Sequence, residues 1–158
     1  MIAVPAVHAP LADVGETFSQ RARFSEADIR AFATSVHDLN PLHHDVAAAR
    51  AAGYHGLIAS GTQLGSVFMA MTATHFARPA RDGRPRLGLG MGFDIRFRAP
   101  VYAEEDIDLR WTVTGSVWKE SLAGWITRLE GDARSAAGLV LSGTGTILVR
   151  APTRGASR

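Results

Sequence analysis

The sequence predicts a single α+β domain in which an antiparallel sheet packs against one long helix. The chain has 158 residues, the usual size of one compact domain, and 46% of them are hydrophobic, enough to fill a core. Apolar residues recur at helical spacing in much of the first half and alternate with polar residues in much of the second. A strand, then helices, then several strands is the element order of an α+β domain.

The two ends of the chain are predicted to lie outside this domain. Residues 1–15, interrupted by Pro5 and Pro10, are expected to form an N-terminal arm. Residues 151–158 are expected to form a frayed C-terminal tail, which leaves residues 16–150 for the domain itself. Neither end is expected to carry chemistry.

An amphipathic helix is predicted from Ser25 to about Asp38. Ser25 is a suitable N-cap, and Asp28 follows it by three residues, where a capping box places its acidic partner. The helix should end before Asn40-Pro41, because the residue that precedes a proline avoids helical backbone angles. An irregular turn is therefore expected directly after the helix.

Two further helices are expected before the main group of strands. Asp45 is placed to cap a short helix over residues 46–52, and Gly53 would stop it. Residues 60–76 have the pattern of a buried central helix. Its apolar positions are Leu64, Val67, Phe68 and Met71, and its small residues are Gly61, Gly65 and Ala73. The small residues allow a sheet to come close, and the apolar ones are expected to be core, with the lining of a substrate tunnel as the alternative.

Strands are predicted where the apolar pattern takes a period of two. The expected strands are an early one at 16–24 and four more near 86–98, 106–117, 125–132 and 139–150. The expected breaks are Ala99-Pro100, 121–124 and 131–138. In the strand over 106–117, apolar and polar residues alternate as they do in a half-buried antiparallel strand.

Composition and charge exclude several kinds of chemistry and partner. Without cysteine the chain has no disulfide and no thiol nucleophile, so histidine and carboxylate remain as reactive groups. A formal net charge of +2 predicts no nucleic-acid partner. No apolar run reaches the roughly 18 residues of a membrane-spanning helix, so no membrane partner and a cytoplasmic location are expected. The local group Arg78, Arg81, Arg84 and Arg86 is interpreted as a solvated loop, with an anion site as the alternative.

The densest group of polar residues runs from His37 to Asp45, where a helix ends and a turn begins. A turn stiffened by Pro41 can bring the Asp38 carboxylate and the His43 imidazole into one small volume, where both can hold one water molecule. One group would take a proton from that water while another donates one to carbon, as in paired acid and base catalysis. The alternative is structural: Asp38 stabilises the turn, and His43 is a surface imidazole.

Three sequence motifs resemble those of a known family. They are Asp38-Leu39-Asn40-Pro41-Leu42-His43-His44-Asp45, Gly56-Leu57-Ile58-Ala59-Ser60-Gly61 and Phe97-Arg98-Ala99-Pro100-Val101. In this order they resemble the MaoC-like family of (R)-specific enoyl-CoA hydratases and dehydratases, and the resemblance extends over residues 16–150. Membership implies a hot-dog fold, in which an antiparallel sheet wraps around a long helix, and usually a dimer or paired dimers.

The resemblance also implies an activity, the reversible addition of water to a trans-2-enoyl thioester to give an (R)-3-hydroxyacyl thioester. Asp38 and His43 match the pair that binds and activates water, and Gly61 matches the glycine whose backbone N–H receives the thioester oxygen. A fixed N–H there stabilises the negative charge that grows on this oxygen during the reaction. No metal or redox cofactor is required, because the conjugated thioester is already an electrophile.

Two weaker candidates for substrate binding are Ser60 and Asn40. Many relatives carry histidine at the position of Ser60, whose alternative role is the N-cap of the central helix. Asn40 is alternatively a residue that shapes the turn. Gly56, which follows His55, is a second candidate for the glycine that binds the thioester oxygen.

Several different functions remain open. A metal site would draw on donors from His37, Asp38, His43, His44 and Asp45. If they are not ligands, His37 and His44 are expected to face solvent, with an effect on the pKa values of the site as the alternative. A hot-dog protein that binds acyl thioesters without turnover, a heteromer subunit and a thioesterase are also candidate functions. The expected partners are an acyl-CoA or acyl-carrier thioester and further copies of this chain, because exposed strand edges favour self-association into a homodimer or larger homo-oligomer.

Overall fold

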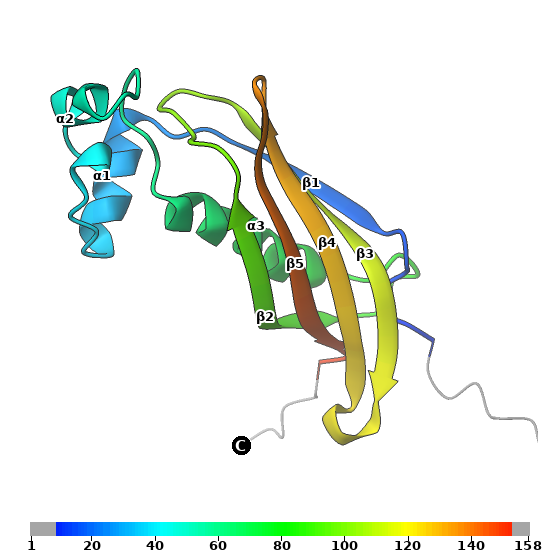
Figure 1. Cartoon of the computed structure of the whole chain (residues 1–158). Coiled ribbons are helices and arrows are strands. Elements are labelled where there is room, and N and C mark those ends of the chain that lie inside the picture. The colour runs from blue at the N-terminus through cyan, green and yellow to red at the C-terminus, as the bar shows by residue number, and fades with distance from the viewer. Residues whose placement is uncertain (1–8, 153–158) are drawn as a thin grey trace, which may run out of the picture.

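Helix α3 (Gly61–Phe76) lies against one face of a five-stranded antiparallel sheet in the computed structural model, which describes residues 9–152 (Figure 1). The strands are β1 (Thr17–Ala22), β2 (Leu87–Phe97), β3 (Ile107–Lys119), β4 (Gly124–Ser135) and β5 (Gly138–Arg150). Helices α1 (Glu26–Ser35) and α2 (Val46–Ala51) lie together beyond the first turn of α3. Single 3₁₀ turns occur at Pro41–His43 and Glu120–Leu122. The predicted α+β class and its central helix are confirmed.

The strands lie in the order β1-β3-β4-β5-β2, and every neighbouring pair is antiparallel. Strands β3, β4 and β5 follow one another through short connections, so the middle of the sheet is built from two hairpins. Strands β1 and β2 are the two edges. The chain enters β2 from α3, which places that edge strand beside the central helix.

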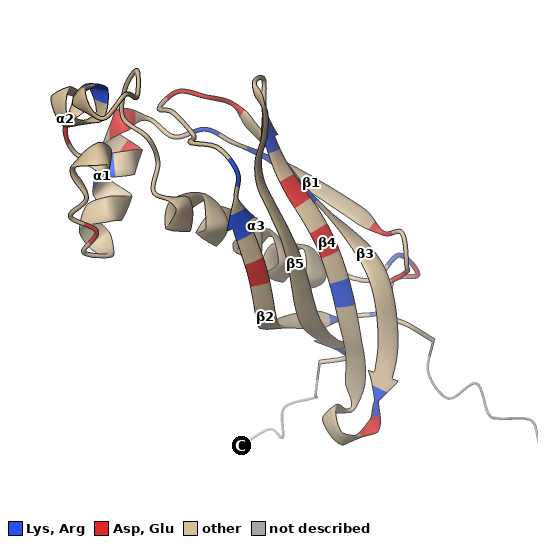
Figure 2. Ribbon diagram, in the orientation of Figure 1, with Lys and Arg blue, Asp and Glu red and all other residues tan. Residues whose placement is uncertain are grey.

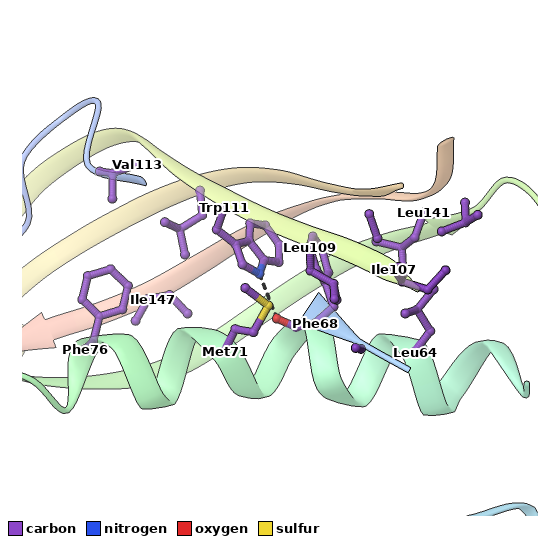
Figure 3. Close-up of a cluster of buried hydrophobic side chains, with 14 of the residues drawn as sticks. Leu64, Phe68, Met71, Phe76, Ile107, Leu109, Trp111, Val113, Leu141 and Ile147 are labelled. Carbon is purple, nitrogen blue, oxygen red and sulfur yellow. Dashed lines mark hydrogen bonds between the residues drawn. The ribbon is translucent and has the colours of Figure 1, made fainter. Parts of the chain in front are cut away.

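The core lies between α3 and the inner face of the sheet (Figure 3). The rings of Phe68 and Trp111 stack with their centroids 4.0 Å apart, and Trp111 Nε1 donates to the Phe68 carbonyl oxygen at 2.8 Å. A Cβ atom at Gly131 would lie within 2.7 Å of both rings, so this strand position requires glycine. Leu64, Phe68 and Met71 are buried as predicted.

The helix ends follow the predicted capping. The Ser25 hydroxyl accepts from the Asp28 N–H, and the Asp28 carboxylate accepts from the Ser25 N–H at 2.8 Å, which is a complete capping box. The Asp45 carboxylate accepts from the N–H groups of Ala47 and Ala48 at the start of α2. These caps fix both ends of the segment that leads from α1 to α2.

Two details of the sequence prediction need correction or completion. The predicted break over 131–138 is too long: β4 continues to Ser135, because the glycine at 131 is a point of close packing and not a chain break. In the predicted N-terminal arm, Leu11 and Ala12 are buried in the core cluster. Residues 1–8 of that arm and 153–158 of the predicted tail lie outside the described residues.

The arginine group over 78–86 is not simply a solvated loop. The Arg86 side chain is 2% exposed and pairs with Glu16 at 2.8 Å. It also donates to the carbonyl oxygens of Leu11 at 2.6 Å and Arg78 at 3.0 Å. Arg86 therefore serves as an internal cross-link.

Across residues 9–152, no helix has the length and hydropathy needed to cross a bilayer.

Candidate active site

The site begins with a tightly hydrogen-bonded turn after α1. His37 takes a left-handed backbone conformation (φ 58°), and the Asp38 N–H returns to the Ala33 carbonyl oxygen at 2.8 Å. The Asp38 side chain then accepts from the Asn40 N–H at 3.1 Å through Oδ1. The Asn40 side chain in turn accepts from the Leu42 N–H at 3.1 Å. The turn thus fixes where the Asp38 carboxylate points.

His43 is held from the opposite side by the connection to α3. Its residue is 7% exposed, and its Nδ1 lies 2.8 Å from the carbonyl oxygen of Ile58. A carbonyl oxygen can only accept, so Nδ1 carries the proton in the neutral ring. His43 Nε2 is then left with a lone pair, and the tautomer of the imidazole is fixed by the backbone.

The two predicted catalytic side chains meet. Asp38 Oδ2 lies 3.4 Å from His43 Nε2. The hydrogen bond from the Asn40 N–H and a second one from the Ser60 hydroxyl hold the pKa of Asp38 below its usual range, although burial opposes this shift. Asp38 is therefore ionised at neutral pH. A carboxylate and an imidazole lone pair face one another, and a molecule with two O–H donors matches both.

A pocket of about 350 Å³ lies beside this pair. It is lined by Asn40, Leu42, His43, Tyr54, Ile58, Ala59, Ser60, Gly61, Leu64, Phe97, Ala99, Pro100 and Val101. Asp38 does not line the pocket itself, but contacts it through His43 and Ser60. The pocket therefore has a mainly apolar wall and one polar corner.

Gly61 lies in this pocket at the first residue of α3. Its N–H has no hydrogen-bond partner within the described residues, as expected for the first turn of a helix. A free N–H at the positive end of a helix dipole favours an oxygen that gains negative charge. A Cβ atom at this position would lie 3.0 Å from the ring of Phe97, so β2 covers the glycine closely.

The weaker candidates differ in their contacts with the site. Ser60 is the N-cap residue of α3, but its side chain makes no capping hydrogen bond and donates to Asp38 Oδ2 at 3.2 Å instead. Asn40 lines the pocket, and its side chain caps the 3₁₀ turn. Gly56 does not line the pocket, and His55 stacks on Tyr102 with ring centroids 3.5 Å apart.

The remaining polar residues of the first motif have other contacts. His44 is half-buried and its Nε2 lies 2.7 Å from the Asp38 carbonyl oxygen, which corrects the expectation that this side chain faces solvent. His37 is exposed, and Asp45 caps α2. Within the described part of the chain, no three histidine or acidic side chains are grouped as ligands of a metal ion.

Sequence reasoning missed three contributors to the site: the Ile58 carbonyl oxygen, the Phe97 ring and the hydrogen bond from Ser60 to Asp38. Ile58 belongs to the second sequence motif and Phe97 to the third. Their membership of these motifs was the only feature of the sequence that could have indicated a role at the site. Their contacts depend on how distant segments pack.

The fold matches that of solved hydratase structures. An (R)-hydratase from A. caviae superposes with a TM-score of 0.72 at 25% identity, covering 91% of this chain and 100% of that one. The fold is therefore the hot-dog fold, as the sequence motifs implied. The model of the MaoC like domain matches residues 11–129, and the chain belongs to this family.

Two curated relatives show how far the sequence similarity extends. The (R)-specific enoyl-CoA hydratase of Aeromonas caviae is 27% identical over 140 residues, 89% of this chain and 96% of that protein. The mitochondrial 3-hydroxyacyl-[acyl-carrier-protein] dehydratase of Arabidopsis thaliana is 32% identical over 97 residues, 61% of this chain and 53% of that protein. The matched segment thus spans about half the length of this plant dehydratase.

Proposed function

We propose that this protein catalyses the reversible addition of water to a trans-2-enoyl thioester, giving an (R)-3-hydroxyacyl thioester. The proposal rests on the geometry of Asp38 and His43, two acceptors 3.4 Å apart beside an apolar pocket. A water molecule supplies the two donors that this pair lacks. The free N–H of Gly61 in the same pocket supplies a donor for the thioester oxygen.

In the hydration direction, His43 Nε2 takes a proton from the water held by the pair. The water oxygen bonds to the β-carbon, and the electrons of the double bond shift so that negative charge collects on the thioester oxygen. The Gly61 N–H donates to that oxygen. The α-carbon then takes the proton from the His43 imidazolium, which the Asp38 carboxylate has stabilised. One water molecule is added, and both side chains return to their starting states.

Two further observations support this function. The names of the two relatives describe a hydratase and a dehydratase, which are the opposite directions of one reaction. The pocket volume of about 350 Å³ is within the range of small-molecule sites, and its apolar wall suits an acyl chain. The proposal covers acyl thioesters of both CoA and an acyl carrier protein. The cytoplasmic location stays a prediction.

The first test is the loss of conjugated absorbance when crotonyl-CoA or a longer enoyl-CoA is mixed with the protein. Asp38→Asn removes the charge at constant shape, and His43→Ala removes the base. Each variant is expected to lower kcat by at least about 100-fold, since a positioned acid or base contributes this much. His37→Asn is the matched control, because asparagine tolerates the left-handed backbone there, and it should keep wild-type activity.

The competing functions give different results in the same experiment. Full activity of both Asp38→Asn and His43→Ala would exclude the assigned pair. Release of a free thiol, measured with a thiol-reactive dye, would indicate a thioesterase. Saturable binding of the thioester, without loss of conjugated absorbance and without release of a free thiol, would indicate a binding protein or a heteromer subunit.

A further inference from the structure

Ser60 has an unexpected hydrogen-bonding role at the start of α3. The residue is 4% exposed, and its hydroxyl donates to Asp38 Oδ2 at 3.2 Å. The same hydroxyl lies 2.8 Å from the hydroxyl of Thr62. Although Ser60 occupies the N-cap position, it makes no side-chain capping bond. Its side chain is therefore committed to the carboxylate and not to the helix.

The direction of this short chain of hydroxyls follows from proton counting. An ionised carboxylate can only accept, so the single hydroxyl proton of Ser60 points to Asp38. The Thr62 hydroxyl must then donate to the Ser60 oxygen. Hydrogen bonds that run in one direction polarise one another, and here they end on a charged group. The final acceptor is Oδ2, the oxygen that faces His43 Nε2 at 3.4 Å.

The second oxygen of the carboxylate is held as well. Asp38 Oδ1 accepts from the Asn40 N–H, so each oxygen of the carboxylate has one fixed donor. Rotation about the last side-chain torsion of aspartate is broad when nothing restricts it, and the Asp38 side chain is 30% exposed. With only the Asn40 bond, the carboxylate could turn its free oxygen away from His43. The Ser60 bond removes that freedom.

We propose that Ser60 is a positioning residue, which holds Asp38 Oδ2 towards His43 through a hydroxyl that Thr62 polarises. This inference rests on the proposed function, because it gives Ser60 a role in that reaction. Ser60 acts through Asp38 and need not touch the substrate. The role differs from substrate binding, since it affects turnover and the ionisation of Asp38 more than affinity.

The test compares Ser60→Ala, Ser60→Thr and Ser66→Ala. Ser60→Ala is expected to lower kcat for crotonyl-CoA roughly tenfold with KM little changed, as for the loss of one hydrogen bond to a charged group. Ser60→Thr keeps the hydroxyl and should restore most of kcat. Ser66 lies one turn beyond Thr62 on α3, is exposed and donates only to the Thr62 carbonyl oxygen, so Ser66→Ala is the matched control.

A second measurement follows the ionisation of Asp38 by carbon-detected NMR. The Ser60 hydrogen bond lowers the pKa of Asp38, so Ser60→Ala should raise it, while the neighbouring imidazoles of His43 and His44 stay in place. Thr62→Val removes only the donor behind Ser60 and should give a smaller rise. This variant tests the same chain of hydroxyls if Ser60→Ala does not fold.

The two proposals can fail separately. An unchanged pKa of Asp38 in both Ser60→Ala and Thr62→Val, or an unchanged kcat in Ser60→Ala, would overturn the role of Ser60. A wild-type protein that never hydrates enoyl thioesters would overturn the proposed function and with it the catalytic role of Ser60. The NMR titration would then still report whether Ser60 holds Asp38.

Discussion

Gly61 has to satisfy two requirements at one backbone position. Its missing side chain allows the ring of Phe97 to lie where a Cβ atom would be only 3.0 Å away. Its N–H, the first of α3, has no partner within the described residues and is free for a substrate oxygen. The two requirements can be separated, because proline is compatible with the first position of a helix and removes the N–H.

Gly61→Pro should lower kcat by a further 100- to 1,000-fold relative to Gly61→Ala, about the effect of removing one oxyanion donor. Both substitutions place a Cβ atom against Phe97, so Gly61→Ala controls for the steric effect. Ser60 already has an extended backbone (φ −58°, ψ 138°), which a following proline requires. Steady-state kinetics with crotonyl-CoA, alongside the thermal midpoint, measure the difference. Equal activity of the two variants would argue against the N–H as the oxyanion donor.

At the scale of single residues, the sequence predicted which side chains lie together where those residues are close along the chain. Asp38 and His43 are five positions apart around a proline, and one turn brings them together. The bond from Ser60 to Asp38 spans 22 positions and depends on how α3 packs against the turn after α1. Propensity for an N-cap indicated the right place for Ser60 and the wrong partner for its hydroxyl.

Strand β2 is the edge of the sheet that lies beside the candidate site. Phe93 and Ile95 pack against the core, so the alternating residues Asp94 and Arg96 point to the outer face of the sheet. Figure 2 shows an acidic and a basic position on β2. Their ion pair is 3.5 Å long, and both side chains are mostly exposed, so it contributes little within one chain. Antiparallel pairing with a second copy about a two-fold axis at Ile95 would place each of the two charges opposite its complement.

We expect a homodimer that depends on this charge arrangement. Asp94→Arg would set like charges opposite one another along the pairing strands and weaken the dimer at least several-fold. Exchange of both residues, Asp94→Arg with Arg96→Asp, restores the complementarity and should restore the dimer. Glu130→Arg, an exposed change on β4 away from the edge, is the control. Sedimentation velocity at micromolar concentration measures all four proteins, and a wild-type monomer would contradict the expected pairing.

The elements themselves were largely predictable from periodicity and caps. The predicted strand at 139–150 differs from β5 (Gly138–Arg150) by one residue, and the predicted helix at 46–52 differs from α2 by one residue. The error in β4 has a physical cause. A glycine usually weakens a strand, but Gly131 is required where the rings of Phe68 and Trp111 meet the sheet. Only the packed structure distinguishes these two uses of glycine.

At the scale of the whole molecule, a partly buried polar cluster joins segments far apart in the sequence. Glu16 Oε1 lies 2.6 Å from His75 Nε2 and 2.8 Å from Arg86. Arg86 also donates to the Leu11 carbonyl oxygen, and its guanidinium lies 4.8 Å from the centre of the Phe76 ring. The cluster thus ties the chain before β1 to the end of α3 and the start of β2. Nothing local in the sequence indicates it, because Glu16 is 59 positions from His75 and 70 positions from Arg86.

This cluster predicts that acid destabilises the fold before ordinary carboxylates titrate. Burial lowers the pKa of His75, and the positive charges of Arg86 and Arg78 add to this, which outweighs the opposing effect of Glu16. An unfolded histidine titrates near pH 6.5, so the unfolded chain binds the proton first. The stability from neutral His75 is therefore complete above about pH 6.5 and is lost as the pH falls towards the lower pKa of the folded state.

The free energy of unfolding, measured with urea at pH 7.5 and 5.5, should accordingly fall in the wild type. His75→Gln has no group that titrates at this position, so its decrease between the two pH values should be smaller. Glutamine also keeps an N–H donor for Glu16, which limits the loss of contacts. His55→Gln, at an exposed imidazole stacked on Tyr102, is the control and should keep the wild-type decrease. If His75→Gln loses as much stability as the wild type, protons taken up elsewhere cause the effect.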